Sequence, residues 1–344
     1  MKIILDAMGG DHAPEAPVLG AIEAAKLYHA QITLVGRGQE ILDVLKKHGI
    51  ENLPNGVQIA NADDVVDMHD DPAEAVRKKK NSSMMVGLRM LAEEQGDAFI
   101  SAGSTGALLS GATLIVKRVK GIRRAAMGPA MPNKAGGKTV ILDCGANAEC
   151  TPEFLLQFGL VGSLYAKKYL GVENPRIGLL NIGTEDTKGT PLQKEAYALL
   201  QNASQRGIIN FVGNVEARDV PLGAVDVVVC DGFSGNVLLK SIEGTAAFMG
   251  SMVSRMFKKN IITKIGALCC SSGIKSLKKL LDYREIGGTQ FLGIKKPVIK
   301  AHGSSDALAF RNAVKQAMDA AKSDISQELE QGLAALNPKE PAND

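Results

Sequence analysis

The chain has 344 residues, of which 45% are hydrophobic, and its formal net charge is +3. This length and apolar content suffice for one large α/β unit or two lobes, and the small net charge gives no indication of nucleic-acid binding. No apolar run approaches the ~20 residues of a membrane-spanning helix, and Met1-Lys2 leads directly into a predicted strand without a signal peptide, so we expect a cytoplasmic protein. The five cysteines show no paired C-x-x-C spacing, which argues against a zinc site.

Five short apolar runs each end at a cluster of glycine, small hydroxyl and acidic or amide residues, and an apolar-periodic segment follows each one. Runs without polar alternation are typical of strands buried on both faces, so we predict an α/β fold with a mostly parallel sheet covered by helices on both faces. Ligands of such sheets bind beyond the carboxyl ends of the strands, where loop amides and helix N-termini suit an anion. The five loops are DAMGGDHAP (6–14), SAGSTGA (101–107), DCGANAE (143–149), NIGTEDTKG (181–189) and DGFSGN (231–236).

Other elements follow from local signals. We predict a strand over 31–35, a helix over 40–48 and a helix over 82–94. Thr151-Pro152-Glu153 is a typical helix start, with a capping hydroxyl followed by proline in the first turn, and the helix should continue to Tyr169.

The composition changes at Gly244. Residues 244–281 contain no acidic residue but seven lysines and arginines, and strand signals are missing, so we predict a helical excursion with a turn near 269–273. A strand at 297–301 should return to the sheet, and a last helix should begin after Ser304-Ser305-Asp306. We therefore divide the chain into an α/β body (1–243 and 282–333), a basic helical excursion (244–281) and a disordered tail (334–344).

Two glycine-rich segments resemble nucleotide-binding motifs only superficially. Val35-Gly36-Arg37-Gly38 follows a strand, but Ile41 stands where the third glycine of a dinucleotide fingerprint should be, so a tight strand-to-helix turn is the better interpretation. Gly136-Gly137-Lys138-Thr139 mimics the end of a P-loop, but it precedes a strand and Pro132 occupies the position of the first glycine. We therefore predict no nucleotide site, and no cofactor.

Three loop residues are candidates for chemistry. His302 follows the strand at 297–301, where this architecture places its ligand, and we favour a functional role for it. His12 occupies the corresponding place after the first strand, where a loop-closing hydrogen bond and a chemical role are equally compatible with the sequence. Lys188 lies in a loop rich in amides and hydroxyls, so it could serve as a point charge for phosphate or an oxyanion.

The excursion alternates apolar and basic residues at helical spacing. It could be a basic surface helix that packs on its own subunit or on a second copy, or a surface for anionic lipid headgroups or an acidic protein. The sequence leaves these alternatives open. The residues predicted to make this membrane or partner contact are Lys258, Lys259, Ile261, Ile262, Lys264, Ile265 and Leu268.

Six ordered segments resemble those of the acyl-acyl carrier protein:phosphate acyltransferases of bacterial phospholipid synthesis. They are LDAMGGDHAP, SAGSTGALL, LDCGANAEC, NIGTEDTKG, DGFSGNVLLK and VIKAHGSSDA, and the resemblance runs from Met1 to about Ala320. It implies a fold like phosphotransacetylase and the isocitrate/isopropylmalate dehydrogenases, a homodimer, and peripheral association with the inner face of the cell membrane. The sequence departs from the family pattern in two places. Ala148-Glu149 stands where the family has Val followed by Asp after Gly-Ala-Asn, and Ala125 stands where a Pro usually follows the arginine, here Arg124.

The resemblance also implies the reaction. An acyl group would move from the thioester of acyl carrier protein to inorganic phosphate, and the acyl phosphate would then serve glycerol-3-phosphate acyltransferase. Such a direct transfer needs no enzyme nucleophile, because phosphate attacks and a thiol leaves; the protein must orient the reactants and stabilise the tetrahedral oxyanion.

Specific roles follow as hypotheses. We predict that Asn236 and Lys188 bind the oxyanion and that His302 protonates the leaving thiolate. Asp6 and Asp231 would brace their loops. The remaining predicted substrate- or phosphate-binding residues are Ser101, Gly103, Ser104, Thr105, His12 and Ser234.

Two other functions remain as alternatives. An NAD(P)-dependent oxidative decarboxylase of the related fold would need a nucleotide site and an Asp-rich metal site, and the sequence shows neither clearly. From a different functional class, the chain could be a non-catalytic membrane scaffold that assembles lipid enzymes.

Overall fold

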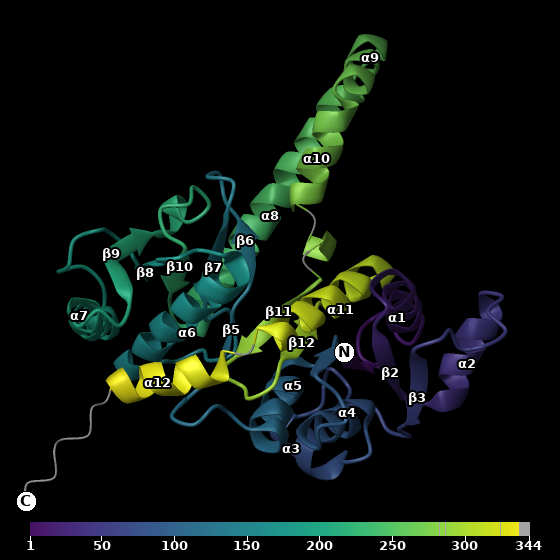
Figure 1. Ribbon diagram of the computed structural model, residues 1–344. Helices are drawn as coiled ribbons and strands as arrows, with labels where there is room; N and C mark the ends of the chain where they lie inside the picture. The colour runs from purple at the N-terminus through teal and green to yellow at the C-terminus, as the bar shows by residue number, and fades with distance from the viewer. Residues whose placement is uncertain (282, 286, 324, 337–344) are drawn as a thin grey trace, which may run out of the picture.

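The computed structural model describes residues 1–281, 283–285, 287–323 and 325–336. Its strands form two sheets (Figure 1). The predicted α/β class is confirmed, but the strands that precede the five glycine-rich loops are divided between these sheets, two in the first and three in the second.

The first sheet has seven strands in the order β3-β2-β1-β4-β12-β11-β5. From β3 to β12 all neighbours are parallel, whereas β11 pairs antiparallel with both β12 and β5. The strand predicted at 297–301 is β12, and it returns to the sheet beside β4. The strands are β1 Lys2–Asp6, β2 Gln31–Gly36, β3 Val57–Asn61, β4 Ala98–Ser101, β5 Ala126–Met127, β11 Gly288–Leu292 and β12 Val298–Ala301.

The second sheet has five strands in the order β6-β7-β10-β8-β9. Its strands β7, β10, β8 and β9 are parallel, and the short β6 is antiparallel to β7. Because β5 and β6 follow one another closely in the chain, they connect the antiparallel edges of the two sheets. The strands are β6 Ala130–Pro132, β7 Lys138–Leu142, β8 Arg176–Asn181, β9 Asn210–Glu216 and β10 Val227–Val229.

Helices cover both faces of each sheet, as the buried apolar runs predict. One face of the first sheet packs on α1 and α11, and the other packs on α4 and α5. In the second sheet, α6, α7 and α12 cover one face, and the start of α8 packs on the other. The helices of the body are α1 Glu15–Tyr28, α2 Gly38–Lys47, α3 Pro72–Lys78, α4 Ser83–Ala92, α5 Thr105–Gly111, α6 Pro152–Leu170, α7 Pro191–Gln205, α11 Ala307–Lys322 and α12 Ser326–Leu336; a π-helical turn Ala112–Val116 continues α5, and 3₁₀ turns occur at Ala217–Asp219 and Tyr283–Glu285.

Short polar residues start several of these helices. Ser82, Ser104 and Asp306 are the N-caps of α4, α5 and α11, and each side chain accepts a backbone N–H of the first turn, which would otherwise lack a partner. Helix α6 begins at Pro152 after Thr151, as the sequence predicts. In the predicted tail, residues 334–336 complete α12, and the rest lies outside the described residues.

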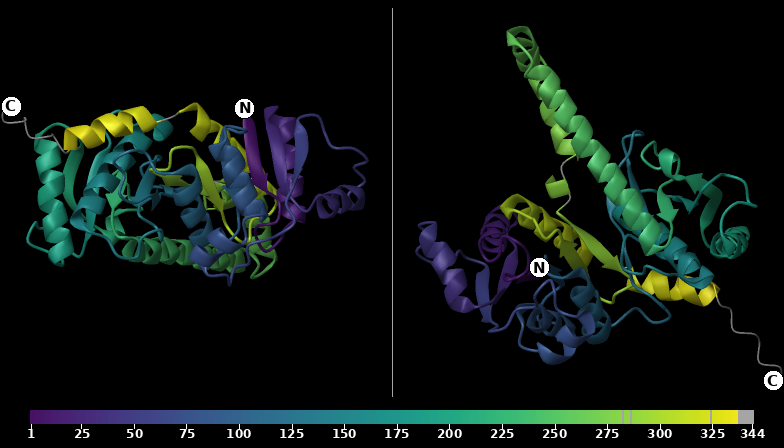
Figure 2. Two further views of the ribbon diagram at one scale, coloured as in Figure 1. Left: turned by 90° about the horizontal axis from the view of Figure 1, so that it is seen from below. Right: turned by 180° about the vertical axis from the view of Figure 1, so that it is seen from behind.

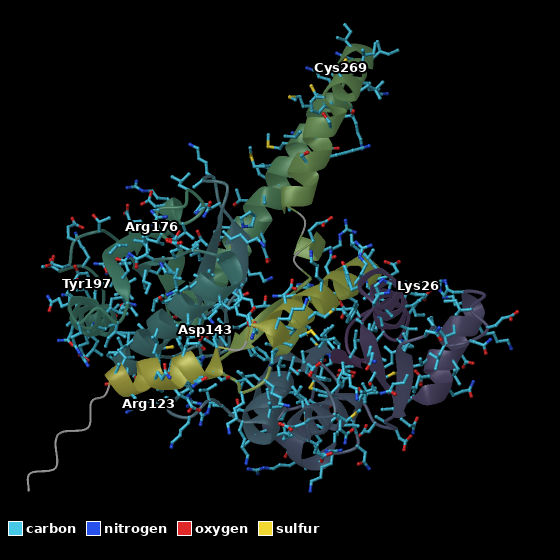
Figure 3. The ribbon with its side chains drawn as sticks, viewed as in Figure 1. Lys26, Arg123, Asp143, Arg176, Tyr197 and Cys269 are labelled. Carbon is cyan, nitrogen blue, oxygen red and sulfur yellow. The ribbon has the colours of Figure 1, made fainter. Side chains whose placement is uncertain are left out.

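The described part of the basic excursion is mostly helical and projects from the body as a hairpin, which the right panel of Figure 2 shows from behind. It consists of α8 Gly232–Phe257, α9 Ile261–Cys269 and α10 Ser271–Leu281. Residues 258–260 connect α8 to α9 without helical structure, and a second break at Cys270 lies inside the predicted turn. One continuous helix, α8, runs across the predicted boundary at 243/244, so the excursion begins within a helix whose first turns belong to the second sheet. Cys269 lies at the tip of the hairpin (Figure 3). The described part of the hairpin extends away from the body, so its described residues beyond the first turns of α8 do not pack on their own subunit.

Candidate active site

Loops that follow three neighbouring strands of the first sheet are joined at its carboxyl edge. The Ser101 hydroxyl, after β4, donates a 2.6 Å hydrogen bond to the carboxylate of Asp6, at the end of β1. The backbone N–H of Asp11 donates to the carbonyl of Gly303, after β12, at 2.8 Å. A Cβ at Gly9 would lie 2.7 Å from the Gly103 nitrogen, so the close approach of the first two loops requires glycine there.

Asp6 and Ser101 support these loops from beneath. Asp6 is buried, and its carboxylate accepts hydrogen bonds from the Ser101 and Ser83 hydroxyls and from the backbone of Met8 and Gly9; burial raises the pKa of Asp6, and these hydrogen bonds oppose the rise. Ser101 is also fully buried, and its hydroxyl accepts the N–H of Gly103 at 3.1 Å. The hydroxyl predicted to contact phosphate therefore has partners within the protein, and the geometry favours a bracing role for both side chains.

The other predicted residues of this loop lie at the start of α5. The Ser104 hydroxyl accepts the N–H of Ala107 at 3.5 Å, so it caps the helix. Thr105 is the first residue of α5 and is half-buried, while Gly103 is buried against the methyl group of Met84. Of this predicted set, Thr105 is the residue whose side chain the structure leaves most accessible.

The second sheet contributes a loop organised by Asp143, which lies near the centre of the molecule (Figure 3). Its buried carboxylate accepts the N–H groups of Met127 (2.8 Å), Ala146 (3.2 Å) and Asn147 (2.6 Å), and the side-chain amide of Asn147 (3.0 Å). Burial raises the pKa of Asp143, although these donors oppose the rise. Because Met127 belongs to β5 of the first sheet, Asp143 joins the two sheets.

The loop 143–149 also packs tightly against the start of α8. The N–H of Gly232 donates to the Asn147 carbonyl at 2.7 Å, and a Cβ at Gly235 would lie 2.0 Å from the Asp143 carbonyl oxygen. Asp231 is the N-cap of α8 and accepts both the N–H and the hydroxyl of Ser234 at 2.8 Å. Asp231 thus braces the helix start, and the Ser234 hydroxyl, predicted to contact substrate, donates to that brace.

One face of α8 brings the two groups of loops together. Asn236, Lys240 and Glu243 follow at helical spacing on the same face of α8. The Asn236 side chain lies beside Gly145, since a Cβ built there would be 3.7 Å from Cγ of Asn236. The charges of Lys240 and Glu243 act on His302 of the first sheet. Asn236 and His302, predicted to act in one site, therefore belong to the same junction between the sheets.

His302 is held as a neutral donor. Its Nδ1 accepts the backbone N–H of Ser304 at 3.2 Å and lies 2.8 Å from the Ser304 hydroxyl, which assigns the ring proton to Nε2. Burial lowers the pKa of His302, and the positive charges of Lys240 and Lys300 lower it further. A neutral imidazole presents an N–H but is a poor proton donor to a thiolate at neutral pH, so this geometry fits oxyanion binding better than the predicted proton transfer.

Lys188 has a different setting from the one predicted. It is exposed in the loop after β8, where its N–H donates to the Glu185 carbonyl at 3.2 Å and its carbonyl accepts from Asn181 at 3.1 Å. The same loop is tied to the edge strand β9, because Asn214 donates to the Glu185 carbonyl at 2.8 Å. Within the described residues, no hydrogen bond or ion pair joins Lys188 to the loops of the first sheet.

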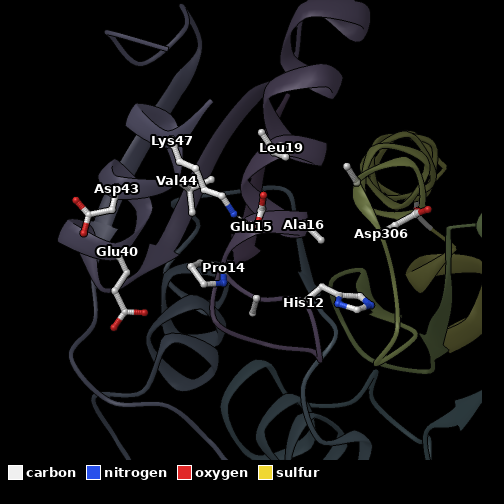
Figure 4. Close-up of a pocket in the computed structure, with 12 residues that line it drawn as sticks. His12, Pro14, Glu15, Ala16, Leu19, Glu40, Asp43, Val44, Lys47 and Asp306 are labelled. Carbon is white, nitrogen blue, oxygen red and sulfur yellow. Dashed lines mark hydrogen bonds and ion pairs between the residues drawn. The ribbon is translucent and has the colours of Figure 1, made fainter. Parts of the chain in front are cut away.

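His12 lies in a pocket beside the helices that cover the first sheet. It lines a pocket of about 640 Å³ between α1, α2 and the start of α11, together with Glu15, Glu40, Lys47 and Asp306 (Figure 4). The Glu15 carboxylate pairs there with Lys47 at 2.8 Å, and that hydrogen bond holds the pKa of Glu15 below its ordinary value.

Three side chains of the junction were not among the predicted site residues. Asp143 directly follows the apolar run 140–142, as Asp6 follows the run 3–5, and this parallel in the sequence could have indicated it. Lys300 interrupts the apolar strand Val298–Ala301, and its ammonium donates to the carbonyl of Ala102 at 3.3 Å and to that of Ala301. Lys240 carried no distinguishing signal, because one lysine on an exposed helix is ordinary.

Two absences concern the described part of the chain only. It holds no group of three or more His, Cys, Asp or Glu side chains that could bind a metal ion. None of its helices combines the length and the apolar content that crossing a membrane requires.

Comparison with known proteins identifies the family. A family model described as fatty acid synthesis protein matches residues 1–328. The chain belongs to this family. It is 47% identical over 340 residues to the phosphate acyltransferase of Alkaliphilus oremlandii, covering 99% of each chain, and 47% identical over 333 residues to that of Brevibacillus brevis, covering 97% of each. The acyltransferase class and the family predicted from the six segments are thereby confirmed.

Solved structures confirm the fold. The chain is similar to a phosphotransacetylase from Streptococcus pyogenes (TM-score 0.59, 19% identity, 96% and 94% of the two chains covered). It is also similar to a branched-chain phosphotransacylase from Enterococcus faecalis V583 (TM-score 0.59, 16% identity, 94% and 100% covered). At these identities the likeness concerns the fold alone, and it supports the predicted phosphotransacetylase-like architecture.

Proposed function

We propose that this enzyme transfers a fatty acyl group from the thioester of acyl carrier protein to inorganic phosphate. The product, an acyl phosphate, would be the donor for a glycerol-3-phosphate acyltransferase in phosphatidic acid synthesis. The observation that supports the proposal is the junction between the sheets, where the charges of Lys240 and Glu243 of α8 act on His302 of the first sheet and the side chain of Asn236, on the same helix, lies beside Gly145 of the second. Family membership supports acyl transfer to phosphate, because the curated relatives are named phosphate acyltransferases.

The chemistry needs orientation and charge stabilisation. Phosphate is already an anionic nucleophile, and a thiolate is a good leaving group, so the barrier lies in bringing the reactants together and in the developing oxyanion. In our proposal, phosphate binds at the carboxyl edge of β4 and β12. The Nε2–H of His302 and the amide of Asn236 donate to the oxyanion across the junction.

Lys188 remains a proposed oxyanion ligand that the structure does not place in the junction. If it reaches the oxyanion in the substrate complex, Lys188→Ala should lower kcat roughly 10²–10³-fold. Turnover near the wild-type rate, with an unchanged melting temperature, would remove Lys188 from the mechanism.

A thioester-cleavage assay tests the reaction. Purified protein is incubated with an acyl carrier thioester, with and without inorganic phosphate, and free carrier thiol is measured. Hydroxylamine then traps acyl phosphate as a hydroxamate. Thiol release that requires phosphate and yields hydroxamate is expected. A nicotinamide-dependent absorbance change with a hydroxy-acid substrate would instead favour the oxidative decarboxylase, and neither signal would favour the scaffold.

We further propose that the hairpin α8–α10 serves peripheral membrane association and homodimer formation. Its apolar side chains are unusually exposed for a folded protein: Ile261 and Ile262 are each 75% exposed, and Leu268 is 74% exposed. Lysines flank them, so the tip offers both apolar area and positive charge to an anionic lipid surface. Along the shaft, Phe248, Met249, Met252 and Met256 are also exposed and offer an apolar face to a second copy.

Two measurements separate these contacts. Replacing Lys258, Lys259 and Lys264 by Gln should weaken co-sedimentation with anionic vesicles and reduce its salt dependence, while the oligomeric state in analytical ultracentrifugation stays unchanged. Unchanged sedimentation with a changed oligomeric state would assign the basic tip to the dimer. Loss of thiol release from carrier substrate, with release from a small thioester preserved, would assign it to the carrier protein.

A further inference from the structure

Three polar side chains form a row across the first sheet at the edge where its loops converge. In the parallel register, Ile4 pairs with Phe99, and Phe99 pairs with Val298; these three apolar residues lie on the face covered by α4 and α5. Two residues further along each strand, the same row continues as Asp6, Ser101 and Lys300, since side chains alternate between faces. The row thus changes from apolar to polar at the carboxyl end of the sheet.

Lys300 differs from its neighbours in this row because its charge lacks a counter-ion. Its Nζ donates to two carbonyl oxygens, those of Ala102 at 3.3 Å and of Ala301. An ammonium has three N–H donors, so one N–H is left for another partner. In the described part of the chain, no carboxylate oxygen lies within 4 Å of Nζ. A half-buried cation that contacts only neutral oxygens is unusual, because buried charges are normally paired.

Burial destabilises the protonated form of Lys300, and the charges around it compensate only in part. Burial lowers the pKa of Lys300 to about 8, and the carboxylates of Asp11 and Asp6 oppose that shift without cancelling it. On the other side, the charge of Lys300 lowers the pKa of His302. In the free enzyme the ammonium of Lys300 is therefore only partly stabilised, and it lies beside the carbonyl of Ala102, which follows Ser101. A bound anion would supply the missing charge.

We propose that Lys300 is the phosphate-binding cation of the active site, with its free N–H directed to a phosphate oxygen beside the loop 101–107. This inference rests on the proposed function for the identity of the anion. Lys300, and not Lys188, would then be the principal source of positive charge for phosphate, because the loop of Lys188 is tied to β9 at the far edge of the second sheet. This role also explains why a lysine interrupts an otherwise apolar strand.

Phosphate binding without turnover tests the inference directly. The dissociation constant for inorganic phosphate is measured by ³¹P NMR or calorimetry for the wild type, Lys300→Met, Lys300→Arg and a control, Lys295→Gln. Lys295 is exposed and precedes the amino end of the same strand, away from the loops. Lys300→Met should weaken binding about 10- to 100-fold, as expected for loss of a charge-assisted hydrogen bond. Lys300→Arg should recover part of the affinity, and Lys295→Gln should bind like the wild type.

The pH dependence supplies a signature that a merely structural role would not produce. Between about pH 7.5 and about 9.5, wild-type affinity should fall as Lys300 loses its proton, whereas Lys300→Arg should show a much weaker fall because a guanidinium stays charged. The other charged or titratable groups facing Lys300 are Asp6, Asp11 and His302. Burial and the charges of Lys240 and Lys300 lower the pKa of His302 from its ordinary value of about 6.5, so the imidazole titrates below this window. In steady-state assays, the KM for phosphate should rise in Lys300→Met more than the KM for the acyl donor.

The outcomes separate this inference from the proposed function. Binding by Lys300→Met within about twofold of wild type, or an unchanged pH slope in Lys300→Arg, would overturn the role of Lys300 while leaving the reaction standing. Absence of phosphate-dependent thiol release in the wild type would overturn the reaction, whereas the binding data would still decide on Lys300. Should Lys300→Met fail to fold, Lys300→Arg and the wild-type pH profile decide.

Discussion

Removing the charge of Asp143 should destabilise the whole protein, because this carboxylate joins the two sheets. Its two oxygens accept four hydrogen bonds, two on each oxygen, from Met127, Ala146 and Asn147. In Asp143→Asn one oxygen becomes an amide nitrogen that must face two donors. Two half-buried donors then lose their acceptor whichever way the amide is turned. At ~1–3 kcal/mol for each donor left without an acceptor, the expected loss is about 2–6 kcal/mol of unfolding free energy.

Urea denaturation followed by far-UV circular dichroism measures this change. The matched control is Asp186→Asn, in the exposed loop after β8, which should change the unfolding free energy by less than about 0.5 kcal/mol. Because Asp143 contacts both sheets, the loss should appear as a shift of a single transition. A loss below about 1 kcal/mol in Asp143→Asn, or an equal loss in the control, would refute this account of how the sheets are joined.

Three further predictions concern stability. Gly235→Ala should lower the free energy of unfolding by at least about 3 kcal/mol, because the new Cβ would lie 2.0 Å from the backbone oxygen of Asp143. The control Gly250→Ala, in the same helix, meets nothing within 4 Å and should raise it by about 0.5–1 kcal/mol. Equal changes of the two variants in denaturation would contradict this. Arg176→Lys should lower the free energy of unfolding by about 1 kcal/mol, because a lysine cannot replace the bidentate ion pair of the guanidinium with Asp226 at 3.0 Å or its hydrogen bonds to two nearby carbonyls. An unchanged denaturation midpoint would show that this pairing does not contribute to stability. Burial alone would raise the pKa of Asp226, but the contacts with Arg176 lower it overall. The ionised Asp226 therefore stabilises the folded state above its unfolded pKa of about 3.9, and this stabilisation is lost on further acidification. The difference in unfolding free energy between wild type and Asp226→Asn should narrow below about pH 4, and a constant difference would count against the ion pair.

Local patterns predicted the elements well. The five apolar runs are all strands, the Thr151-Pro152 start is the beginning of α6, and the acid-free segment is helical. These features depend on residues near one another in sequence: periodicity, capping and turn chemistry act over a few positions. The six loop segments also sufficed to predict the family, because their order and content are more specific than any single loop.

The composition of the site was predicted less completely. That His302 and Asn236 act in one site stays a prediction. The structure shows that Ser101 supports its loop and that Lys188 lies in a loop tied to β9. The sequence treated each loop as equivalent, because each follows a buried strand. Which loops meet depends on which strands are neighbours.

The sequence by itself determined that this chain forms parallel strands ending in glycine-rich loops, that it contains a basic helical excursion, and that it resembles the phosphate acyltransferase family. Only the tertiary structure decided that the strands divide into two sheets, that Asp143 joins them, and that Lys300 stands in one row with Asp6 and Ser101. The physical reason is that backbone hydrogen bonds are the same for any pair of strands. Pairing and register are therefore set by the packing of helices and side chains far apart in sequence, and this packing determines which polar groups share a site.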